Sequence, residues 1–181
     1  MRFKAKIMDE QQIRRAVIRM AHEIIERNRG AMQVYLVGIQ RRGLPLAKEI
    51  AKVIRAVEGI NIPVGSLDIT LYRDDLSMIA ELPQIKKTDL PFSITDANII
   101  LVDDVLYTGR TIRAALEVLA ECGRPRTVQL AVLIDRGNRE LPIGGDYVGK
   151  VLPTSRDELV SVNVPEIDGC SSVEIYSMNE D

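Results

Sequence analysis

The chain has 181 residues and a formal net charge of −2; 46% of its residues are hydrophobic and 28% are charged. These values are ordinary for one globular domain, and they exclude a strongly basic protein that attracts nucleic acid over its whole surface. No run approaches the ~20 apolar residues that span a bilayer, no signal peptide precedes the first predicted helix, and the two cysteines lack metal-ligand spacing and suit a reducing compartment. We therefore expect a cytoplasmic protein with neither a membrane nor DNA as a partner.

The first predicted element is an amphipathic helix from Asp9 to about Arg27. Asp9 and Gln12 predict a capping box at its start, where Met8 is placed to pack against Ile13. The apolar residues of this helix recur at helical spacing and share one face: Ile13, Val17, Met20, Ala21, Ile24 and Ile25.

The middle of the chain alternates between strands and helices. A strand is predicted at Val34–Gly38, a helix from about Leu44 to Val57 and a strand from Val64 to Tyr72. The segment Arg73–Ala97 is polar, contains prolines and has few periodic apolar positions. An irregular segment of this length predicts a functional loop or a lid.

Alternation continues to the end of the chain. The further predicted elements are a strand at Ile99–Asp103, a helix at Ile112–Leu119 and strands at Val128–Ile134, Tyr147–Leu152, Leu159–Val164 and Val173–Tyr176. This order predicts an α/β fold with a central, mostly parallel sheet flanked by helices, and ligands at the carboxyl ends of the strands.

The run from Ile99 to Thr111 is the most informative in the sequence. A buried strand ends in Asp103 and Asp104, and a turn of small residues then opens a helix. Such a helix start binds anions through its unpaired N–H groups and the helix dipole. The two carboxylates suit hydroxyl groups or a divalent cation instead, so the run predicts a site for a ribose 5-phosphate. The alternative is that both acids merely cap a turn.

Two further loops follow predicted strands and carry arginines. Gly38–Gly43 contains Arg41 and Arg42 beside glycine, which suits pyrophosphate, although paired arginines are often only solvated surface. Asp68–Leu76 contains Arg73, which either reaches the leaving pyrophosphate or forms salt bridges at the root of the loop.

A third loop, Asp135–Pro142, follows the strand at Val128–Ile134, where a loop that recognises a base would lie. Arg136 is a candidate contact to the base or the phosphate. Asp135 has the alternative, structural role of orienting Arg136.

Together these segments resemble the PyrR family, bacterial regulators of pyrimidine-biosynthesis mRNA that are also uracil phosphoribosyltransferases. The resemblance rests on Val37–Gly43, Asp68–Leu76, Val102–Thr111 and Asp135–Pro142 and covers nearly the full chain. It implies a type I phosphoribosyltransferase fold with a core at about 9–135, a hood from about 136–181 and a lid loop at about 73–97.

The resemblance also implies an activity and partners. The reaction is the Mg²⁺-dependent conversion of uracil and phosphoribosyl pyrophosphate to UMP and pyrophosphate. The regulatory partner is the leader of pyr mRNA, bound in the presence of UMP or UTP, and the assembly is a homodimer or a larger tetramer or hexamer. The alternatives are a regulator that senses UMP with negligible turnover, and a phosphoribosyltransferase for another base.

Site residues carry over by position. Asp103 and Asp104 would hold the ribose hydroxyls directly or through Mg²⁺, while Arg41, Arg42 and Arg73 would stabilise the departing pyrophosphate. The remaining substrate contacts implied are Gly43, Val105, Leu106, Tyr107, Thr108, Gly109, Arg110, Thr111, Arg136 and Val160.

Three positions depart from relatives in an informative way. Tyr107 stands where relatives that act on 6-oxopurines have a carboxylate, and a phenol is a poor base at neutral pH, which favours a pyrimidine. Arg41 replaces a common Thr and adds a cation to the pyrophosphate loop. Asn138 replaces a common His, so no step can use an imidazole there.

The predicted RNA contacts lie mainly on the first helix. Arg15, Arg19 and His22 are spaced to form one stripe away from the apolar face, and Arg14, Arg27 and Arg139 would extend it. The alternative is a solvated, salt-bridged helix face, because Glu23 and Glu26 are interleaved. Only the resemblance favours RNA binding.

Overall fold

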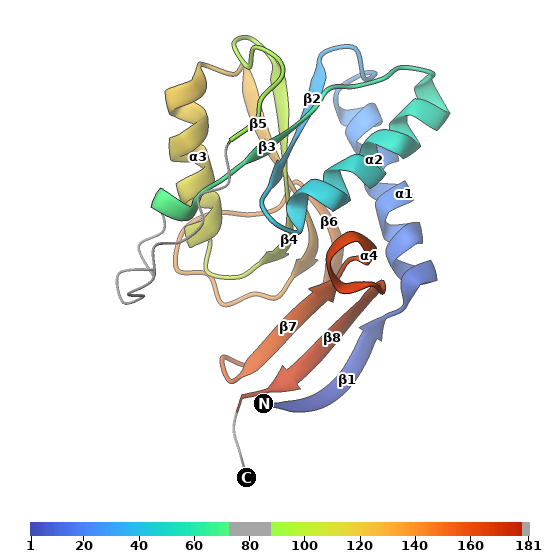
Figure 1. Cartoon of the computed structure of the whole chain (residues 1–181), viewed down its shortest axis with the longest axis vertical. Helices are drawn as coiled ribbons and strands as arrows, with labels where there is room; N and C mark the ends of the chain where they lie inside the picture. The colour runs from blue at the N-terminus through green and yellow to red at the C-terminus, as the bar shows by residue number, and fades with distance from the viewer. Residues whose placement is uncertain (73–87, 179–181) are drawn as a thin grey trace.

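The computed structural model describes residues 1–72 and 88–178 and contains two β-sheets (Figure 1). The larger sheet has five parallel strands in the order β3–β2–β4–β5–β6. These strands are β2 (Val34–Ile39), β3 (Val64–Leu67), β4 (Asn98–Leu106), β5 (Thr127–Asp135) and β6 (Tyr147–Val151). The helices are α1 (Glu10–Arg27), α2 (Gly43–Glu58), α3 (Arg110–Cys122) and α4 (Pro165–Asp168).

Helices cover both faces of the five-stranded sheet, with α1 and α2 on one side and α3 on the other (Figure 1). Alternate residues of β4 therefore enter different cores, because successive side chains of a strand point to opposite faces. Ile100 and Val102 pack in the core under α1 and α2, whereas Ile99 and Leu101 pack in the core under α3. This explains why the central strands read as continuous apolar runs, and it confirms the predicted fold class.

The smaller sheet is antiparallel and has the order β1–β8–β7, from β1 (Arg2–Met8), β8 (Ser172–Ser177) and β7 (Glu158–Asn163). We call this sheet and α4 the hood. Its composition differs from the expected hood at 136–181 in two ways. The N-terminal strand β1 joins it, whereas β6 belongs to the five-stranded sheet.

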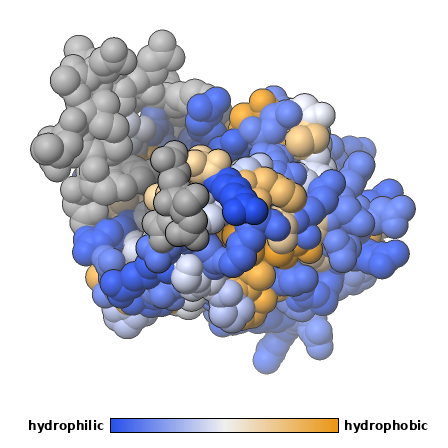
Figure 2. Space-filling model, turned by 90° about the horizontal axis from the view of Figure 1, so that it is seen from below, coloured by the Kyte–Doolittle hydropathy of each residue, from blue (hydrophilic) through white to orange (hydrophobic). Residues whose placement is uncertain are grey.

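The hood strands form the lower end of the molecule in Figure 1, and Figure 2 views that end. Apolar residues gather there among hydrophilic ones (Figure 2). Phe3 and Leu159 are among the exposed apolar residues of the hood, and Phe3 packs edge-to-face on Tyr176 with ring centroids 5.8 Å apart.

The predicted start of the first helix is confirmed. Asp9 is the N-cap, its carboxylate accepts from the Gln12 amide at 2.8 Å, and the Gln12 side chain accepts from the Asp9 amide at 2.9 Å. Met8 and Ile13 are both buried in the same core.

Two strands end several residues away from their predicted last residue. The strand expected at Val64–Tyr72 ends at Leu67, because the Asp68 carboxylate accepts from the amide and hydroxyl of Thr70 and turns the chain into a short 3₁₀ helix. The strand expected at Ile99–Asp103 runs on to Leu106, so both acids lie within β4.

The predicted lid falls partly outside the described residues, which resume at 88. Within 88–97 the chain is irregular and forms one bridge, Ser66 with Asp89.

Candidate active site

The acid pair sits where β4 approaches the carboxyl edge of the sheet. Asp103 is 7% exposed and its carboxylate accepts from the Asp104 amide at 3.0 Å; the Asp104 carboxylate accepts from the Val105 amide at 2.9 Å. Burial raises the pKa of Asp104, and the hydrogen bonds and the charge of Arg42 offset only part of that rise. A ligand that donates hydroxyl protons, or a cation, would favour the ionised form of this carboxylate.

The loop between β4 and α3 is shaped for a close ligand. Gly109 is the N-cap of α3 with φ +93°, a conformation that residues with a Cβ rarely adopt. The first-turn amides of a helix have no intrahelical acceptor, so the start of α3 offers donors to an anion. The Thr108 hydroxyl already accepts from the Arg110 amide at 3.3 Å, and the Arg110 side chain pairs with Glu140 at 2.7 Å.

Arg139 stabilises this loop through hydrogen bonds to backbone carbonyls. Its guanidinium donates to the carbonyls of Tyr107 and Ile143, both at 2.8 Å, and pairs with Asp135. Burial alone would raise the pKa of Asp135, but the bonds from Arg139 and the Gly137 amide outweigh it and lower that pKa. One expectation changes here: Asp135 pairs with Arg139 and not with Arg136. Arg139, expected to extend the RNA stripe, has these partners within the chain, and its contact with RNA stays a prediction.

Arg136 links the same loop to the hood. It is 4% exposed and lies over the Tyr107 ring, with its guanidinium carbon 4.0 Å from the ring centroid. Its nitrogens donate to the Thr154 hydroxyl at 2.9 Å and to the carbonyls of Ser155 and Glu158 at 2.9 and 2.7 Å. The structure thus gives Arg136 partners in the protein, and a direct substrate contact stays a prediction.

Asn138 also joins the loop after β5 to the hood. Its side chain donates to the Thr154 carbonyl at 2.8 Å, and its backbone has φ +58°. Asn tolerates this left-handed conformation better than most residues. Both the hydrogen bond and the left-handed backbone suit an asparagine at this position.

The arginine loop after β2 lies beside β4. Gly43 opens α2 so close to that strand that a Cβ would stand 2.3 Å from the Val102 carbonyl oxygen. Arg41 is exposed, and the Gln40–Arg41 peptide is cis. Arg42 pairs through two nitrogens with Asp168 of α4, at 2.8 and 3.3 Å. The sequence pointed to no role for Asp168, because a contact across 126 residues leaves no local signal.

The predicted RNA stripe divides into two sets. Arg19 donates to the β6 carbonyls of Val148 and Gly149 at 3.0 and 2.6 Å, and Arg27 pairs with Asp146 at 2.7 Å. The guanidinium of Arg27 also lies 5.7 Å from the centroid of the Tyr147 ring. All five of these α1 side chains are exposed, and Arg14, Arg15 and His22 are the ones for which the described residues show no such bond.

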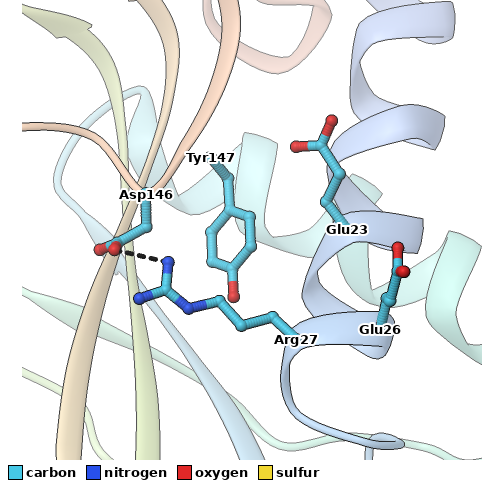
Figure 3. A pocket seen from close by; sticks show the side chains of 5 residues that line it. All are labelled: Glu23, Glu26, Arg27, Asp146 and Tyr147. Atoms are coloured by element: carbon cyan, nitrogen blue, oxygen red, sulfur yellow. Dashed lines mark hydrogen bonds and ion pairs between the residues drawn. The ribbon is translucent and has the colours of Figure 1, made fainter.

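A hollow of about 400 Å³ lies next to this helix. In Figure 3, Arg27 reaches across Tyr147 to Asp146, and two further acids of the lining come from α1. The lining residues of the hollow are Glu23, Glu26, Arg27, Asp146 and Tyr147. Because Tyr147 begins β6, the hollow lies at the amino edge of the parallel sheet, away from the acid pair.

The structure thus brings most predicted substrate contacts to one edge. The acid pair, the loop to Thr111 and Arg41–Gly43 lie at the carboxyl ends of β4 and β2. Val160 is buried in β7 of the hood and packs in the core cluster under α1 and α2. Arg73 lies outside the described residues. Within the described ranges, no three His, Cys, Asp or Glu side chains cluster as a metal site, and no helix is long and apolar enough to cross a membrane.

Comparisons with known proteins first define the class. A family model described as the phosphoribosyl transferase domain matches residues 5–165. The hypoxanthine phosphoribosyltransferase of Trypanosoma cruzi has a similar structure, with a TM-score of 0.74 at 14% identity over 97% of each chain. A hypoxanthine-guanine phosphoribosyltransferase of Bacillus anthracis has a TM-score of 0.71 at 18% identity, covering 96% of this chain and 98% of that one. At such identities these structures show the fold alone, which is that of type I phosphoribosyltransferases.

Closer relatives define the family. A protein of Acetivibrio thermocellus named bifunctional protein PyrR is 64% identical over 177 residues, 98% of this chain and 96% of the relative. A protein of the same name from Thermus thermophilus is 57% identical over 176 residues, 97% of each chain. The chain belongs to the PyrR family of phosphoribosyltransferases, which confirms the resemblance seen in its motifs.

Proposed function

We propose that this protein converts uracil and phosphoribosyl pyrophosphate to UMP and pyrophosphate, and that it regulates pyrimidine operon mRNA by binding it in response to UMP or UTP. The observation that carries the enzymatic part is the arrangement at the carboxyl edge of the sheet. A buried acid pair lies directly before the start of α3 and near the arginine loop of β2.

Each group has a chemical task in this proposal. The 5-phosphate lies against the 107–111 loop, where helix-start amides and the hydroxyls of Thr108 and Thr111 donate to it. Asp103 and Asp104 accept from the ribose hydroxyls. Their negative charge lies close to the anomeric carbon, which becomes positive as pyrophosphate leaves, while Arg41 and Arg42 stabilise the leaving group.

Magnesium fits this site only together with the substrate. Asp103 and Asp104 supply hard oxygen donors, and a cation would favour the ionised form of Asp104, which burial disfavours. Two carboxylates are too few for a protein cage, so phosphate oxygens of the substrate would complete the shell. When bound, the ion would neutralise part of the pyrophosphate charge.

The choice of a pyrimidine is supported by Tyr107. Its ring is stacked under Arg136, and no carboxylate stands at that position to exchange a proton with a purine nitrogen. The test is an assay with radiolabelled uracil, phosphoribosyl pyrophosphate and Mg²⁺, run beside hypoxanthine, guanine and orotate. Turnover of uracil alone is expected. Turnover of another base instead contradicts the proposal, and binding of UMP without turnover identifies a regulator that only senses the nucleotide.

The RNA part is supported by the exposed cations of α1. Arg14 and Arg15 are free to meet phosphates, whereas Arg19 and Arg27 first have to leave partners on β6 or in the turn before it. Arg15→Ala is expected to weaken binding of the pyr leader RNA in the presence of UMP and to make the salt dependence shallower, by a slope of about 1. Filter binding across a KCl series measures both. If Arg15→Ala changes binding no more than Arg156→Ala does, in the turn before β7, this face of α1 is only solvated surface.

We also propose a homodimer, which would place two α1 faces in one assembly and concentrate positive charge that the net charge of −2 hides. Light scattering after size exclusion tests this, and a monomer at assay concentrations contradicts it. The cytoplasmic location stays a prediction.

A further inference from the structure

Asp168 is the one hood carboxylate that holds a cation of the pyrophosphate loop within the described residues. Arg42 presents Nη2 to Asp168 Oδ1 at 2.8 Å and Nε to Oδ2 at 3.3 Å. The two side chains are 33% and 20% exposed, so water screens the pair only in part. Two of the five donors of this guanidinium are therefore committed to the hood.

Hydrogen bonds with the backbone of Val164 fix the orientation of the Asp168 carboxylate. The Val164 amide donates to Asp168 Oδ2 at 2.9 Å, and the Asp168 amide donates back to the Val164 carbonyl at 2.8 Å. Gly169 then reverses the chain with φ +70°. Asp168 thus stays in place without Arg42, whereas Arg42 is the longer and more adjustable partner.

Arg42 also faces the active site. Its positive charge lowers the pKa of Asp104, and the charges of Arg42 and Arg41 both contribute to a lowered pKa of Asp168, after the bond from Val164. A Cβ on the adjoining Gly43 would stand 3.3 Å from Asp103 Cα, so Arg42 is close to the acid pair as well as to the hood acid that it binds. Figure 1 shows α4 where the hood meets the five-stranded sheet, beside the start of α2.

We propose that Asp168 competes with pyrophosphate for Arg42 and thereby sets how tightly the enzyme holds this leaving group. This rests on the proposed function only in that Arg42 contacts pyrophosphate. An arginine offers its strongest anion contact through a two-pronged fork, and the Nε–Nη2 fork is occupied by Asp168. Pyrophosphate either takes the remaining donors or displaces the carboxylate, and both weaken its binding. The consequence is faster release of product and a looser contact between hood and core when the site is filled.

Asp168→Asn tests the competition, because its amide oxygen can still accept from Val164 while the charge is lost. We expect the dissociation constant for inorganic pyrophosphate, measured by calorimetry in MgCl₂, to fall about fivefold, the effect of one partly exposed ion pair. In steady-state assays the KM for phosphoribosyl pyrophosphate falls as well, while kcat does not rise. Glu166→Gln is the matched control, since it removes the same charge from the same short helix without touching Arg42, and it leaves both constants unchanged.

Two further variants separate competition from a structural role. Asp168→Ser gives the same tightening through a different uncharged side chain, should Asn disturb the fold. In an Arg42→Lys background, which lacks the fork, Asp168→Asn gives little or no tightening. Unchanged or weaker binding of pyrophosphate by both folded Asp168 variants overturns the proposal. Because the probe is pyrophosphate alone, this outcome is distinct from a failure to turn over uracil.

Discussion

Asp104 combines a cost in folding free energy with the substrate contact proposed for it. Its carboxylate is held within β4 beside Asp103, where burial raises its pKa. The unfolded chain binds a proton at this position less tightly than the folded one does. Ionisation at neutral pH therefore costs folding free energy, and this cost is absent below about pH 4, where both states are protonated.

Asp104→Asn is expected to reduce UMP formation at least about 100-fold, because the ribose hydroxyls lose a charged acceptor near the reacting carbon. The variant is expected to be more stable than the wild type at pH 7 and equally stable at about pH 3, below the ordinary pKa of an aspartate. Thermal melts at both pH values and the uracil assay measure this.

Asp157→Asn, at an exposed position in the turn before β7, is the matched control and should change neither turnover nor stability. Full turnover by Asp104→Asn would remove this residue from the site, and a variant that is less stable at pH 7 would contradict the cost assigned to burial.

Residues of the site were predictable where their neighbours in sequence carry the signal. Asp103, Asp104 and Gly109 stand in one contiguous run, so a strand followed by a helix start was enough to place them together. The partners of Arg42 and Arg136 were not predictable, because Asp168 lies in α4 and Glu158 in β7, and no local sequence pattern links these elements to the two arginines.

At the scale of elements, the backbone of the loop between β4 and α3 is held by residues 139–141. The Thr108 carbonyl accepts from the amides of Glu140 and Leu141 at 3.0 and 3.1 Å, and Arg139 bonds the Tyr107 carbonyl. The phosphate loop is thus fixed by the loop that follows β5. A helix start that is fixed before binding loses little entropy when the anion arrives.

Arg139→Ala is expected to lower the unfolding free energy by about 1–3 kcal/mol, because carbonyl groups of Tyr107 and Ile143 lose their donor. The KM for phosphoribosyl pyrophosphate should rise in the same variant. Arg139→Lys should recover little of the lost unfolding free energy or of the KM, since one ammonium group cannot make the several directed hydrogen bonds of a guanidinium.

Chemical denaturation and steady-state kinetics measure these effects. Arg14→Ala, exposed on α1, is the control and should change neither quantity. If Arg139→Ala impairs only RNA binding, the structural role assigned here is wrong.

Most elements were predictable from periodicity, since α1, α2, α3 and the buried strands have clear apolar patterns. β1 was missed although charged and less polar residues alternate from Arg2 to Ile7. Its pairing partner β8 lies at the other end of the chain, so no local turn signals the sheet. The end of β3 was misplaced because the Asp68 turn overrides the β-favouring residues that follow it.

At the scale of the whole molecule, Arg136 ties the two sheets together. It comes from the end of β5, stacks on Tyr107 and bonds three groups at the entrance to β7. The hood and the loop between β4 and α3 therefore share one buried cation. A ligand bound against the 107–111 loop is therefore expected to alter the position of the hood through Arg136, and a ligand bound to the hood to alter the loop.

Arg136→Ala is expected to destabilise the protein by about 3 kcal/mol, because two carbonyls and a hydroxyl are left without their buried donor. Arg156→Ala, an exposed arginine of the same hood connection, should cost less than about 0.5 kcal/mol. Urea unfolding of both variants measures the difference. A loss in Arg136→Ala no larger than that of the control would show that the stack and the hood bonds do not join the sheets.

The central claim is that a nucleotide lies at the carboxyl edge of the five-stranded sheet, and a crystal structure with bound UMP tests it most directly. The account predicts the phosphate against residues 107–111, the ribose hydroxyls at Asp103 and Asp104, and the base beneath the hood. UMP bound in the hollow beside α1, or anywhere else while the acid pair stays empty, would contradict it.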